Sequence, residues 1–234
     1  MLKRLIISFT ILCVCALLYA GDVAAFVDIG FSSDGQTYLF GQYGSTDKTY
    51  QGYADIFTVD IDSNTFVKNK IFTITPSTKT QGSSGINIYK DLYAKHKNDI
   101  LQYHPKPADL ANIIYIRSDS KTTTNEIVFK DFEHSSKNNE IFYHVKLVPW
   151  FSGKTATSKS SFFISIEKQD ATGKVLYKDV AGTPDYKRTG VTDYTIDKIL
   201  CDKDSKSLVF VVEKKIATTN GFNIRYMVEA VSIK

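Results

Sequence analysis

The chain has 234 residues and a mild positive charge, with 29 Lys plus Arg against 25 Asp plus Glu. Nucleic-acid-binding proteins usually concentrate basic residues on one face, whereas here they are dispersed, so we expect no nucleic-acid partner. Hydrophobic residues make up 43% of the chain, which is a composition typical of a globular protein with a packed core.

Residues 1–25 have the order of a secretory signal peptide. The basic Lys3 and Arg4 are followed by an almost uninterrupted apolar run, Leu5 to Tyr19, and then by small residues. The run is shorter than the roughly 20 apolar residues that a spanning helix needs. We therefore expect cleavage, no membrane span in the mature chain, and a periplasmic or secreted location in a bacterium.

Two positions fit the small residue that precedes a cleavage site. Cleavage after Ala20 would release a chain that starts at Gly21, and cleavage after Ala25 would release one that starts at Phe26. The second position fits slightly better because Val23, two residues before Ala25, is also small. We therefore expect a signal peptide over residues 1–25 and one β-rich exported domain over residues 26–234.

The clearest strand pattern lies in residues 26–61. A turn sequence containing Asp34 and Gly35 precedes an apolar strand, and a polar loop separates that strand from a returning one. In the returning strand, Phe57, Val59 and Ile61 alternate with polar residues, which is the period of a half-buried strand. The pattern predicts antiparallel hairpins.

A single substantial helix is expected at about residues 86–103. Ile88, Leu92, His96 and Ile100 recur every four residues and form an amphipathic stripe. Pro105 ends the pattern, because proline disfavours helical geometry in the residue before it.

The rest of the chain reads as short strands separated by turn sequences. We expect a mainly β (α+β) fold of antiparallel sheets, arranged either as a sandwich or as part of a propeller. A faint internal repeat relates segments 31–40 and 200–210, since both place an apolar residue before a polar turn and an apolar strand after it. Repeats of this kind occur in propeller blades, and two ordinary hairpins explain them equally well.

Segments 26–44 and 53–60, together with the closing segment 209–234, resemble a family of predicted secreted bacterial proteins, domain of unknown function 2259. The resemblance implies export and carries no assigned activity. Segment 31–60 is also similar to one blade of the TolB-type propeller repeat, with Ser33 at the usual proline position. That similarity implies a hairpin.

No pattern of metal ligands or nucleophiles is complete. The calcium-loop-like start at Asp60 lacks the required glycine and glutamate, because Thr65 and Ile71 stand in their places. His96 and His104 are eight residues apart, which is about 12 Å along a helix that rises 1.5 Å per residue, so they are too far apart to share one ion. No Gly-x-Ser-x-Gly motif is present. We expect no metal or cofactor, and a buried, inert thiol at Cys201.

The remaining clue is the aromatic content, which is 13% of the chain. Trp150 and Phe151 stand at a strand end, where exposed aromatic residues contact partners or glycans. Export together with the absence of a recognisable catalytic pattern favours a non-enzymatic binding or envelope-interaction protein, with an envelope protein or a glycan as its partner. The alternative is an extracytoplasmic hydrolase with paired carboxylates, whose catalytic residues the sequence leaves unidentified.

Overall fold

The computed structural model describes residues 21–118, 126–153, 155–219 and 221–233, so the apolar run of the expected signal peptide lies outside the described residues. Within them the strands form three antiparallel sheets. The N-terminal sheet contains β1 (Ala25–Phe31), β2 (Thr37–Ser45), β3 (Gly52–Asp60) and β4 (Thr65–Ile74). The central sheet contains β5 (Ile113–Ile116), β11 (Val191–Cys201), β12 (Ser207–Thr218) and β13 (Gly221–Ser232). The outer sheet contains β6 (Glu126–Lys130), β7 (Ile141–Ser152), β8 (Lys159–Asp170), β9 (Val175–Ala181) and β10 (Arg188–Thr189).

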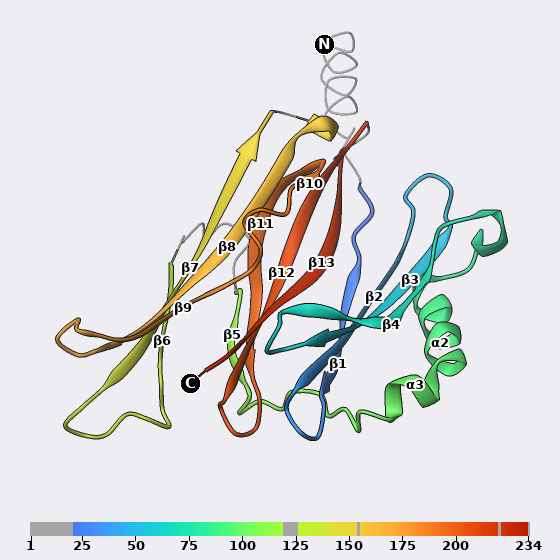
Figure 1. Cartoon of the computed structure of the whole chain (residues 1–234). Coiled ribbons are helices and arrows are strands. Elements are labelled where there is room, and N and C mark those ends of the chain that lie inside the picture. The colour runs from blue at the N-terminus through green and yellow to red at the C-terminus, as the bar shows by residue number, and fades with distance from the viewer. Residues whose placement is uncertain (1–20, 119–125, 154, 220, 234) are drawn as a thin grey trace, which may run out of the picture.

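The three sheets stack in layers, and the central sheet lies between the other two (Figure 1). Strand β12 shows why, because its successive side chains point to opposite faces. Phe210 and Val212 pack against the outer sheet, whereas Val209 and Val211 pack against the N-terminal sheet, and all four are fully buried. A run of apolar residues without alternation thus marks a strand that is buried on both faces. The predicted mainly β, antiparallel fold is confirmed.

The helical layer covers the free face of the N-terminal sheet (Figure 1). The predicted helix is present, but it consists of α2 (Gly85–Lys95) and the short α3 (Lys97–Leu101). The break falls at His96, whose φ of −109° and ψ of 20° are not helical. Its ring stacks on Phe72 of β4, with 3.8 Å between ring centroids. The contact with the sheet thus accompanies the end of the first helix.

The apolar stripe of the helix faces the sheet as predicted. Ile88, Leu92 and Ile100 are buried against a cluster that includes Leu39 and Ile56. Tyr89, expected at the margin, is buried as well.

Leu92→Ala is expected to lower the free energy of unfolding by about 2–5 kcal/mol, because the leucine is 2% exposed and its removal leaves a cavity. Lys95→Ala, on the exposed face of the same helix, is expected to change it by less than about 0.5 kcal/mol. Urea unfolding of both variants measures the difference. A neutral Leu92→Ala would mean that the helical layer does not brace the sheet.

The faint internal repeat corresponds to a shared turn geometry. In the turn between β1 and β2, the Ser32 N–H donates to the Thr37 carbonyl oxygen (2.9 Å), and the Ser32 hydroxyl accepts the Thr37 N–H (2.9 Å). In the turn between β11 and β12, Asp202 and Ser207 make the equivalent pair of bonds, at 3.3 and 2.7 Å. Two adjacent sheets therefore contain the same side-chain-anchored turn.

Candidate binding groove

A groove of about 700 Å³ lies where strands β7 and β12 end and strands β11 and β13 begin. This volume falls in the range of about 300–1,000 Å³ that is typical of small-ligand sites. The aromatic, hydroxyl-bearing and charged side chains of its lining are Phe151, Ser158, Thr192, Asp193, Lys215, Thr218, Thr219 and Phe222. The groove therefore combines an apolar interior with polar groups that could orient a ligand.

Phe151 and Phe222 supply the aromatic surface of the groove. Their side chains are 40% and 42% exposed, respectively, so each keeps a free face. Phe151 stacks on Tyr194 with 5.9 Å between ring centroids, and the Tyr194 hydroxyl is 2.8 Å from the Ser160 hydroxyl. The Lys215 ammonium lies 4.3 Å from the centroid of the Phe222 ring, which is a cation–π distance. Both rings are thus held by the framework and need little ordering when a ligand binds.

The structure places the two aromatic residues predicted from the sequence on opposite faces of β7. Successive side chains of a strand alternate between faces, so Trp150 points away from the groove that Phe151 lines. Trp150 is 47% exposed, and the Lys187 ammonium lies 4.0 Å from its ring centroid. Lys187 also donates to the Ser161 hydroxyl at 3.1 Å. Phe151 therefore belongs to the groove, and Trp150 belongs to a separate surface.

The polar side of the groove contains one carboxylate among the lining residues that the structure describes, Asp193. Its Oδ1 accepts the backbone N–H of Tyr194 at 2.9 Å. The Thr192 hydroxyl donates to the Lys215 carbonyl oxygen at 3.2 Å. These bonds fix the polar side chains next to the Lys215 cation.

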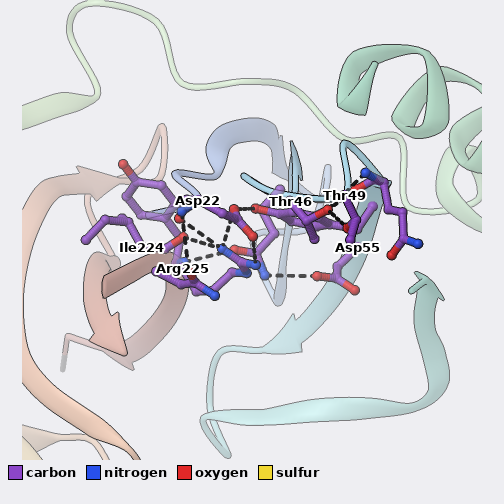
Figure 2. Close-up of polar contacts among 11 residues, drawn as sticks. Asp22, Thr46, Thr49, Asp55, Ile224 and Arg225 are labelled. Atoms are coloured by element: carbon purple, nitrogen blue, oxygen red, sulfur yellow. Dashed lines mark hydrogen bonds and ion pairs between the residues drawn. The ribbon is translucent and has the colours of Figure 1, made fainter. Parts of the chain in front are cut away.

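A buried ion pair joins Asp22 and Arg225, as Figure 2 shows. We call Asp22, Tyr53 and Arg225 the N-terminal clamp. Arg225 donates to both Asp22 carboxylate oxygens, at 2.9 and 2.6 Å, and the Tyr53 hydroxyl donates to Oδ1 at 2.6 Å. The Asp22 side chain is 4% exposed and that of Arg225 is 18% exposed. The clamp joins the first described residues to the N-terminal and central sheets.

The edge of β13 is covered by side chains of the N-terminal sheet. Gln42 accepts the Tyr226 N–H at 2.9 Å and donates to Asp55 at 3.0 Å. Burial raises the pKa of Asp55, and hydrogen bonds, that from Gln42 first, oppose this effect. On β12, burial lowers the pKa of Lys214 to about 8, with a smaller contribution from the nearby Arg188 and Arg225 guanidinium groups. These groups lie outside the lining of the groove.

The remaining residues considered from the sequence are the possible metal ligands and the thiol of Cys201. The described residues include no group of three or more His, Cys, Asp or Glu side chains that could hold a metal ion. Cys201 is 6% exposed, and burial raises the pKa of its thiol, so the predicted buried thiol is confirmed.

No helix in the described part of the chain has the length and apolar character needed to cross a membrane.

Sequence reasoning missed Phe222, Lys215 and Asp193. The signal nearest to the groove is the turn sequence before Phe222, which predicts a hairpin and thus an exposed strand end. The turn sequence does not indicate which other strands lie next to Phe222 in the fold.

Comparison of the chain with curated proteins and with solved structures gives no significant match. A family model described as a predicted secreted protein, DUF2259, matches residues 39–232. This match covers most of the chain, and the protein therefore belongs to the DUF2259 family of predicted secreted proteins.

Proposed function

We propose that this is a non-enzymatic binding protein of the bacterial envelope, and that the groove between Phe151 and Phe222 is its binding site. The observation that carries the proposal is the pair of half-exposed, framework-held rings in a groove of about 700 Å³. An amphipathic ligand suits this surface, with an apolar or aromatic group against the rings and an anionic group near Lys215. The partner that we favour is an envelope protein that presents an apolar or aromatic side chain to the rings and an anionic group to Lys215.

The lining of the groove supports binding over the alternative hydrolase. A glycosidase-type mechanism requires two carboxylates that flank the scissile bond. Among the described lining residues only Asp193 carries one, and its Oδ1 already accepts a backbone N–H. The acids whose pKa is raised by partial or full burial, Asp28, Asp55 and Glu229, do not line the groove.

The experiment uses 8-anilinonaphthalene-1-sulfonate, a probe with an aromatic body and one anionic group. The chain has a single tryptophan, Trp150, next to Phe151, so energy transfer from Trp150 reports binding near the groove. We expect Phe222→Ala to weaken probe binding by about 10-fold or more, because a buried aromatic contact contributes about 1.5–3 kcal/mol. Lys215→Gln should weaken it through loss of the cation.

The matched control is Tyr50→Ala, which removes an aromatic side chain that is 69% exposed and lies outside the groove lining. Its probe affinity should equal that of the wild type. Unchanged affinity in Phe222→Ala, or equal weakening in Tyr50→Ala, would contradict the proposed site. A neutral oligosaccharide that displaces the probe would favour a glycan ligand over the protein partner proposed above.

A further inference from the structure

The segment before β1 is an integral part of the fold. The Ile224 N–H donates to the Asp22 carbonyl oxygen at 2.8 Å, and the Ala24 N–H donates to the Ile224 carbonyl oxygen at 3.1 Å. The Asp22 N–H donates to the Asn223 side chain at 3.2 Å. These bonds pair residues 22–24 with the start of β13, where a parallel bridge joins Val23 and Ile224.

The side chain of Asp22 adds the N-terminal clamp to this backbone pairing. A chain that began at Phe26 would lack the carboxylate that receives two Arg225 N–H groups and the Tyr53 hydroxyl. It would also leave the Arg225 guanidinium, now 18% exposed, without its ion-pair partner. Removing one partner of a buried ion pair is strongly destabilising.

Gly21 also fits the fold as a glycine. A Cβ atom at residue 21 would overlap the backbone carbonyl group of Phe222, so any other side chain would force the two segments apart. Phe222 lines the groove, so Gly21 lies against the backbone of a groove residue.

We infer that the export signal is removed by hydrolysis of the Ala20–Gly21 peptide bond, so that the mature protein begins at Gly21. A signal peptidase would consume one water molecule, leaving a carboxylate on Ala20 and an α-ammonium group on Gly21. Ala20 is the small residue required before the bond, and the apolar run ends directly ahead of it, at Tyr19. The alternative bond after Ala25 lies inside the folded unit, at the first residue of β1. The inference concerns maturation and does not depend on the proposed binding function.

The test is export of the full chain from a bacterial host, followed by N-terminal sequencing and intact-mass measurement of the exported protein. We expect a single product that begins at Gly21. A product that begins at Phe26 or at any other residue, or an uncleaved chain, would overturn the inference.

A matched pair of variants locates the bond independently. Ala20→Glu should reduce the amount of processed protein by at least tenfold. Val23→Glu should leave the Gly21 product unchanged, because Val23 is 64% exposed in the fold and is the third residue of the proposed mature chain. If Val23→Glu blocks processing and Ala20→Glu does not, the cleavage site follows Ala25 and the inference is wrong.

Discussion

Replacing Arg225 with alanine is expected to lower the free energy of unfolding by about 3–5 kcal/mol, because it leaves a buried carboxylate without its cation. Asp22 is 4% exposed, and Arg225 donates to both of its oxygens at hydrogen-bond distances. The variant also loses the guanidinium that lies 4.2 Å from the centroid of the Tyr53 ring. Urea unfolding, followed by circular dichroism, measures the change.

The control for Arg225→Ala is an ion pair of similar length at the surface. Lys178 lies 2.6 Å from Glu167, and its side chain is 63% exposed. Lys178→Ala should cost less than about 1 kcal/mol, because exposed ion pairs gain little over hydration. The double variant Asp22→Ala, Arg225→Ala should cost less than the sum of the two single variants, since neither charge is then left alone. A cost below about 1 kcal/mol for Arg225→Ala would show that the clamp contributes little.

Local chemistry predicted the elements whose pattern is regular. The turn around Gly35 and the alternation of Phe57, Val59 and Ile61 correspond to the hairpins of the N-terminal sheet. Leu92 and its neighbours on the helical stripe correspond to the buried face of α2. In the helix, the residue period and the buried face agree, so the sequence alone is informative. The half-buried strand predicted from the alternation is wrong in one respect: Val59 and Ile61 face the central sheet, but Ile56 on the opposite face is buried under the helical layer, so both faces of β3 are covered.

Strand β11 could not be predicted because its apolar residues do not keep a period of two. The register with β12 shifts between Val191 and Asp193 and again between Ile196 and Lys198. Each bulge adds a residue to one strand and changes which side chains face the core. Buried positions therefore move from Ile196 to Ile199, and the sequence pattern loses its alternation.

The groove depends on contacts between distant segments, which explains why the sequence indicated only part of it. The strand-end position of Phe151 predicts an exposed aromatic surface, and Phe151 does line the groove. The same position predicts Trp150, although strand alternation places its side chain on the other face. Phe222 is far away in sequence, and only the docking of the central sheet on the outer sheet brings it to the groove.

The interface between the N-terminal and central sheets contains a row of four aromatic rings, one from each strand of the N-terminal sheet. Phe40 lies 5.7 Å from Phe26 and 4.8 Å from Phe57, and Phe57 lies 5.3 Å from Phe66, measured between ring centroids. Exposure differs sharply along the row, since Phe40 is fully buried and Phe66 is 47% exposed. The same substitution, Phe to Ala, can therefore be compared at a buried position, Phe40, and at an exposed one, Phe66.

Phe40→Ala is expected to lower the free energy of unfolding by about 3–5 kcal/mol, because it removes a buried ring and leaves a cavity between two stacked sheets. Phe66→Ala should cost about 1 kcal/mol or less, because water already reaches much of its ring. Urea unfolding of both variants tests the difference, and a similar slope of free energy against urea would show that each unfolds as a similar unit. Equal costs for the two variants would mean that the central sheet does not seal Phe40, and that the contact between these two layers is looser than the burial of Phe40, Val209 and Val211 indicates.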